Sequence, residues 1–153
     1  MIGDGYWLSV RRNDPRAFAL YRRHYSVYKN MKPYRAVGET NFLGPGECMV
    51  LLTSCGQAVF AWQRNTVQRY DGQTGVCCTI FRNESPILSS DLIREADMLA
   101  WQRWPGERHF TYVDHTRIRH KRDPGRCFRK ADWTVCGHNK DGRLTLLERV
   151  PHP

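Results

Sequence analysis

The segment 89–104 constrains the fold more than any other part of the sequence, because its apolar residues recur at helical spacing. Ser89-Ser90-Asp91 is typical of a helix start, and Pro105-Gly106 ends the pattern. The apolar positions between these signals are Leu92, Ile93, Ala96, Leu99, Ala100 and Trp104. Strand-like runs precede the helix at 76–81 and follow it at 109–113. A long amphipathic helix between strands predicts a mixed α/β fold.

The rest of the chain supplies further short elements. Asn13-Asp14-Pro15 is typical of a helix start, and we expect that helix to run to about Tyr25. The other predicted elements are strands at 6–12, 49–53, 58–63, 134–137 and 144–150, a helical turn at 127–131, and loop structure over 27–47. Asp141-Gly142 favours a tight turn within the last hairpin. The order β-α-β-β-β-α-β-α-β-β predicts a single α+β domain over 1–153.

The cysteines and apolar runs indicate the compartment. The six cysteines include no C-x-x-C pair, so we expect reduced thiols, with Cys77 and Cys78 on opposite faces of one strand. A zinc site built on Cys136 and His138 is an alternative. The longest apolar runs are too short to cross a membrane, and Met1–Gly5 does not resemble a signal peptide. We therefore expect a cytoplasmic protein with no membrane partner.

The charge favours a nucleic-acid partner. The chain carries 24 basic and 15 acidic side chains, a net charge of +9, and all but five of the basic residues are arginine. Guanidinium groups bind phosphates bidentately, although a GC-rich genome also produces arginine. Tyrosines alternate with basic residues over 21–35, and half of the residues in 117–130 are basic. We expect contacts to double-stranded DNA from Arg22, Arg23, Arg117, Arg119, Lys121 and Arg122; the alternative is a solvated surface.

The element order and the segment 123–133 resemble the GNAT acyltransferase fold. Asp132-Trp133 stands where that family commonly has Gly-Phe. The resemblance implies a central mixed, mostly antiparallel sheet flanked by helices. GNAT enzymes hold the pyrophosphate of acyl-CoA on a glycine-rich loop, where this chain has Ser89-Ser90-Asp91-Leu92 and no glycine. Ser89 and Ser90 are therefore candidate cofactor contacts, but we do not expect standard acetyl-CoA binding.

A narrower resemblance is to the phage Mom family, GNAT-like proteins that modify adenine in DNA. The matching positions are His24-Tyr25, Ser90 and Asp114. The resemblance implies iron(II) held by His24, Tyr25 and Asp114, a nitrogen and oxygen ligand set that suits this ion. Phe128 stands near the place where the family has a later aromatic hydroxyl. The alternative for His24 is a position at a solvated helix end, where His and Arg side chains interact favourably with the C-terminal end of the helix dipole.

The resemblance implies a phage or prophage protein that alters the adenine amino group and protects DNA from restriction in the host-cell cytoplasm. The resemblance makes Tyr25, Ser90 and Asp114 catalytic candidates, with an unidentified small-molecule donor. Arg82 is a further catalytic candidate from its position, because it leaves a strand just before the diverged loop and is placed to clamp a cosubstrate carboxylate or phosphate. For Arg82, a salt bridge to Glu84 or a neighbouring acid is an equal alternative. Two other functions stay open: a conventional acyl-CoA N-acyltransferase, and a non-catalytic DNA-binding module. We expect core positions for Trp62, Trp101 and Trp104.

Overall fold

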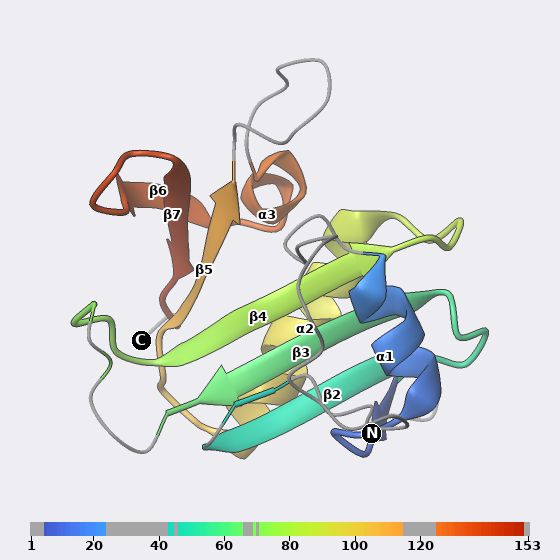
Figure 1. Ribbon diagram of the computed structural model, residues 1–153. Helices are drawn as coiled ribbons and strands as arrows, with labels where there is room; N and C mark the ends of the chain where they lie inside the picture. The colour runs from blue at the N-terminus through green and yellow to red at the C-terminus, as the bar shows by residue number, and fades with distance from the viewer. Residues whose placement is uncertain are drawn as a thin grey trace.

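The computed structural model describes residues 5–23, 43–44, 46–65, 69, 71–114 and 125–151, and these form a mixed sheet with helices on both faces (Figure 1). The strands are β1 (Trp7–Val10), β2 (Glu47–Thr53), β3 (Ala58–Arg64), β4 (Val76–Asn83), β5 (His109–Asp114), β6 (Thr134–His138) and β7 (Leu144–Arg149). The helices are α1 (Pro15–Arg22), α2 (Ser89–Arg103) and α3 (Arg126–Lys130). The strands lie in the order β1-β2-β3-β4-β5-β7-β6. The predicted α+β class and element order are confirmed.

Most element boundaries fall within two residues of the predicted ones, and the end of α1 is the main correction. The start is as predicted, because the Asp14 side chain accepts a hydrogen bond from the backbone N–H of Arg16 at 2.8 Å and Pro15 follows it. The helix ends at Arg22, not near Tyr25. The backbone N–H of Arg23 closes the last turn on Leu20.

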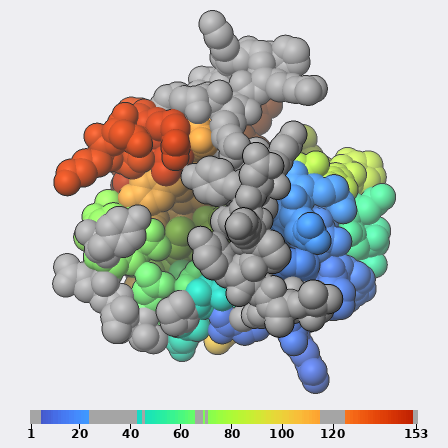
Figure 2. All heavy atoms as spheres, viewed as in Figure 1, coloured from blue at the N-terminus to red at the C-terminus, as the bar shows by residue number. Residues whose placement is uncertain are grey.

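The two faces of the sheet carry separate apolar cores. Helix α1 packs on one face, where Ala17 and Leu20 are fully buried (Figure 1). The strand residues beneath it are Val50, Leu52, Val59, Ala61 and Ile80. A space-filling view of this face shows α1 in blue on one side of the molecule and the β6–β7 hairpin in red on the other (Figure 2).

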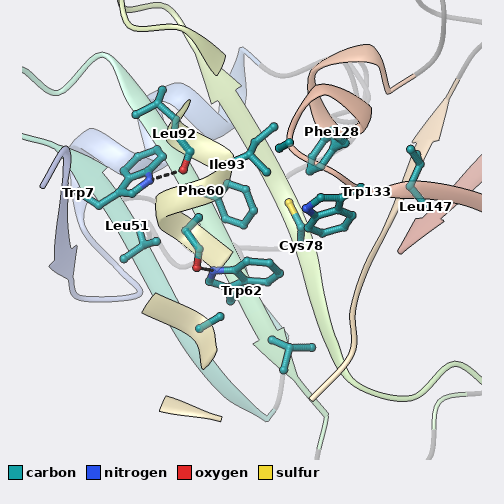
Figure 3. Packing of buried hydrophobic residues seen from close by; sticks show 14 of the residues in the cluster. Trp7, Leu51, Phe60, Trp62, Cys78, Leu92, Ile93, Phe128, Trp133 and Leu147 are labelled. Atoms are coloured by element: carbon teal, nitrogen blue, oxygen red, sulfur yellow. Dashed lines mark hydrogen bonds between the residues drawn. The ribbon is translucent and has the colours of Figure 1, made fainter. Parts of the chain in front are cut away.

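Helix α2 covers the opposite face and packs on large aromatic residues (Figure 3). The indole N–H groups of Trp7 and Trp62 donate hydrogen bonds to carbonyls of α2, at 2.8 and 3.1 Å. These bonds satisfy the polar atoms of side chains that are otherwise apolar and fully buried. The core positions predicted for Trp62 and Trp104 are confirmed, whereas Trp101 is half-buried and stacks on His109 with ring centroids 4.3 Å apart.

Strands β4 and β5 form the parallel pair in an otherwise antiparallel sheet, and they pair at one end. Val76 lies opposite His109 and Cys77 opposite Phe110, after which the strands diverge toward their carboxyl ends (Figure 1). Gly75 permits the close approach at the paired end, because a side chain there would clash with the backbone carbonyl of Arg108. The two strands therefore begin together and end apart.

The cysteines behave as predicted. All six are free thiols, and Cys77 and Cys78 point into different cores, one with Phe110 and the other under α2. Burial raises the pKa of the Cys77 thiol to about 11. Among the helices that the structure describes, none is long and apolar enough to cross a membrane.

Candidate functional site

Half of the candidate residues predicted from the sequence lie in the part of the chain that the structure describes. These are Arg22, Arg23, Arg82, Ser89, Ser90 and Asp114. His24, Tyr25, Arg117, Arg119, Lys121 and Arg122 lie outside the described residues. Arg23 and Arg82 are in one cluster at the carboxyl end of β4, and Asp114 ends β5. Because β4 and β5 are parallel, these carboxyl ends are at the same end of the sheet.

Glu84 joins the end of α1 to the end of β4. The Arg23 guanidinium binds its carboxylate bidentately, through Nε at 2.8 Å and Nη2 at 2.9 Å. Arg82 Nε donates to the same carboxylate at 2.8 Å. The two guanidinium groups lower the pKa of Glu84 to about 2, so the carboxylate is ionised at neutral pH. The salt bridge that sequence analysis held open for Arg82 is present, and sequence analysis missed its second partner, Arg23.

The start of α2 lies directly after this cluster. Asn83 donates through its side-chain amide to the Ile87 carbonyl at 2.7 Å and to Ser89 Oγ at 3.0 Å, which ties the connection to the helix. Leu88 precedes the first turn, and no side chain caps the helix. The Ser90 side chain points into the protein, with 4% of the residue exposed. Asp91 brings a negative charge into the first turn, as expected from the sequence.

Asp114 occupies the end of β5, as predicted. Its side chain is 12% exposed, and Arg143 Nε lies 3.5 Å from its carboxylate. Arg143 belongs to the turn between β6 and β7, which the register places beside Asp114 because Asp114 pairs with Leu144. Sequence analysis did not identify Arg143, since the pairing of β5 with β7 brings together residues distant in the chain.

The proposed iron ligands are represented in the described residues by Asp114 alone. No cluster of three or more histidine, cysteine, aspartate or glutamate side chains suited to a metal ion occurs within the described ranges. The Asp114 carboxylate is already paired with a guanidinium. These residues do not by themselves fit a metal centre, so we derive no chemical step through a metal.

A second ionic network lies in the core and was not predicted. Asp97 of α2 is fully buried and accepts hydrogen bonds from His109 Nδ1 at 2.7 Å, Trp133 Nε1 at 3.0 Å and Arg149 Nη1 at 2.8 Å. A carboxylate between these groups assigns the His109 proton to Nδ1. His109 Nε2 has no hydrogen-bond partner among the described residues. The signal in the sequence was an acid within the apolar stripe of 89–104.

The Asp97 network has the residue types of a catalytic dyad but not its accessibility. The His109 ring lies between the indoles of Trp101 and Trp62, at centroid distances of 4.3 and 4.5 Å. Both His109 and Asp97 are 0% exposed. A general base must reach its substrate within hydrogen-bond distance, so we assign this network to the stability of the fold.

Comparison with known protein families, curated proteins and solved structures finds no match.

Proposed function

We propose that this protein is a GNAT-like transferase, resembling the phage Mom family, that modifies the adenine amino group in DNA. The strand order and the parallel strands β4 and β5, which separate toward their carboxyl ends, support the GNAT-like part. A local feature supports it too. Asp132 stands where the family commonly has glycine, and it adopts φ = 74°, a conformation that favours glycine. Trp133, in place of the usual phenylalanine, is 2% exposed in the core.

The Arg23–Glu84–Arg82 cluster is the observation that carries the proposal. It anchors the residue immediately before His24 to the carboxyl end of β4. Asp114 lies at the carboxyl end of the neighbouring strand β5. Arg23, the neighbour of His24 in sequence, and Asp114 thus lie at the same end of the sheet, and this supports the grouping that the family resemblance implies. Open parallel strands commonly carry their binding sites at this end.

In this proposal the arginines hold DNA and the sheet end receives the base. Arg22 and Arg23 contact backbone phosphates beside the site, together with the basic residues of 117–130. An adenine within a duplex must leave the base stack before its amino group can react, which costs a few kcal/mol. Asp114 brings a carboxylate to this end of the sheet, where it is paired with Arg143.

Mass spectrometry of nucleosides tests this function. DNA from cells that express the protein is digested and compared with DNA from cells that express Asp114→Asn. We expect a new adenosine derivative with the unaltered chain and its loss with Asp114→Asn. Arg64→Gln, a change at the other end of the sheet, is the control and should retain the product. An unchanged set of nucleosides with the folded, unaltered protein would contradict the proposal.

One observation favours a conventional acyl-CoA N-acyltransferase as the second candidate. The first turn of α2 has no side-chain cap, and it follows β4 directly, so its backbone N–H groups are suited to a phosphate. Asp91 in the same turn opposes this function. Calorimetric titration with acetyl-CoA separates the candidates. If acetyl-CoA binds and the nucleoside assay finds no modified adenosine, the acyltransferase is favoured. DNA binding with neither acetyl-CoA binding nor a new nucleoside indicates a non-catalytic module.

A further inference from the structure

The Arg23–Glu84–Arg82 cluster has an excess of positive charge and unused hydrogen-bond donors. Two guanidinium groups share one carboxylate, which leaves a net charge of +1. Arg82 uses Nε on Glu84, and within the described structure neither of its Nη atoms has a hydrogen-bond partner. Arg23 likewise keeps Nη1 after its bidentate contact. The carboxylate therefore orients both arginines without consuming their donors.

The backbone beneath the cluster is held in place. The backbone N–H of Glu84 donates to the Gln57 carbonyl at 2.8 Å, and Arg82 pairs with Val59 in the register of β4 with β3. Val59 belongs to the core under α1, so its partner Arg82 is on the face of the sheet that α1 covers. The Arg82 side chain is 35% exposed, and that of Arg23 is 50% exposed. A ligand from solvent can thus reach guanidinium groups whose orientation is already set, which lowers the entropic cost of binding.

The opposite end of the sheet carries the reverse arrangement. There, Arg64 lies between the carboxylates of Glu47 and Glu107, at 3.1 and 3.0 Å, and the net charge is −1. Every nitrogen of the Arg64 guanidinium is within an ion pair or a hydrogen bond. The same residue types therefore leave guanidinium nitrogens without a partner among the described residues at one end of the sheet, whereas at the other end every guanidinium nitrogen of Arg64 contacts a carboxylate.

We propose that Arg82 and Arg23 form a preorganised binding site for a phosphate group. The Nη atoms of Arg82 supply the bidentate contact that a guanidinium makes with phosphate oxygens, and Arg23 adds charge and a further donor. The phosphate belongs either to a nucleic-acid backbone or to a phosphorylated small molecule. This binding site deepens the proposed function, in which Arg23 contacts a DNA phosphate, but it does not require that the protein modifies adenine.

Binding of two probes tests the site and identifies the source of the phosphate. One probe is a fluorescein-labelled 20-base-pair DNA duplex measured by anisotropy, and the other is ADP measured by calorimetry. Arg82→Gln should weaken the binding of at least one probe about ten-fold, the effect of losing one strong charge-assisted contact. Arg64→Gln removes the same charge from the opposite end of the sheet and should change affinity less than about two-fold. Arg82→Lys keeps the charge but loses the bidentate geometry, so it should bind more weakly than the unaltered protein.

Each outcome of these titrations decides something. Weakening for DNA alone assigns the phosphate to a nucleic-acid backbone, and weakening for ADP alone assigns it to a small molecule. For DNA, the magnitude of the slope of log affinity against log salt concentration should also fall by about one, because one phosphate contact is lost. Equal effects of Arg82→Gln and Arg64→Gln would overturn the proposal. It would also be overturned if the unaltered protein bound neither the DNA duplex nor ADP. The adenosine modification assay is independent of these results, because phosphate binding is measured without any reaction.

Discussion

Asp97 and Glu84 are both carboxylates that accept several hydrogen bonds from cationic or polar donors, but they differ in burial. Asp97 is fully buried between His109, Trp133 and Arg149. Glu84 lies at the surface, with 30% of its side chain exposed. In the core, each charge must be compensated by protein groups because water is absent. At the surface, water and salt screen the same interactions.

The difference in burial separates their roles. The Asp97 network joins α2 to β5, to the residue before β6 and to the end of β7, so it links the C-terminal hairpin to the rest of the core. Removing any member leaves at least one of the remaining polar or charged groups without one of its hydrogen-bond partners in the core. The Glu84 network holds two guanidinium groups at an accessible end of the sheet, where their positive charge remains available to a ligand. We therefore expect mutations in the first network to affect stability and mutations in the second to affect binding.

The largest expected effect comes from Asp97→Ala. It leaves the partly exposed Arg149 guanidinium and the buried His109 Nδ1 without their acceptor, so the free energy of unfolding should fall by about 3–5 kcal/mol. Urea denaturation followed by tryptophan fluorescence measures this loss. Glu84→Ala is the matched truncation and should cost less than about 1 kcal/mol. Equal losses in the two variants would refute the division of roles.

His109→Phe should have an intermediate effect. The phenyl ring retains the aromatic contacts with Trp101 and Trp62, but it removes the donor to Asp97 Oδ1. Loss of one partner from a buried hydrogen bond to a charged group costs about 1–3 kcal/mol. The same urea titration applies, with Trp101→Phe as a control that alters the stacking and leaves the Asp97 hydrogen bonds in place. A His109→Phe protein as stable as the unaltered chain would show that the hydrogen bond contributes little.

The two regions also differ in how well the sequence predicted them. Periodicity over 89–104 and the Pro105-Gly106 stop predicted α2 to within a residue. The same periodicity contained the signal for the buried network, since Asp97 lies between Ile93 and Ala100 on the apolar stripe. Its partners were not predictable, because they come from the start of β5, the end of β7 and the residue before β6, which the fold brings together.

At the surface, the local pair was easier to predict than the distant one. Arg82 and Glu84 are two residues apart, and side chains at this spacing share a side of an extended chain, so their salt bridge was a stated alternative. Arg23 lies 61 residues from Glu84, and no periodic pattern links them. The placement of β7 between β5 and β6 could not be predicted for the same reason, because β5 and β7 pair although they are not consecutive in the chain.

Glu84→Gln should destabilise the protein slightly and in a salt-dependent way. The change leaves two guanidinium groups without an anionic partner, at a cost below about 1 kcal/mol that shrinks at high salt. Glu107→Gln is a matched control, because the Glu107 side chain is 32% exposed and Arg64 retains Glu47 after the change. Thermal unfolding at low and high salt compares the two variants. A larger effect for Glu107→Gln would show that the number of guanidinium groups per carboxylate does not set the cost.

The smallest expected effect is the pH dependence that Glu84 contributes. Its pKa is lowered from 4.5 to about 2, chiefly by the hydrogen bonds from Arg23 and Arg82. A carboxylate with a lowered pKa in the folded state stabilises the protein above its unfolded-state pKa, and this contribution is lost as pH falls toward the folded-state pKa. The difference in unfolding free energy between the unaltered chain and Glu84→Gln should be constant from pH 7 to about 6 and narrow from about pH 5 to pH 3. Urea titrations of both proteins at each pH measure it. A difference that widens as the pH falls would mean that protonation of Glu84 is favoured in the folded state, which would contradict the role of the carboxylate in orienting the two arginines.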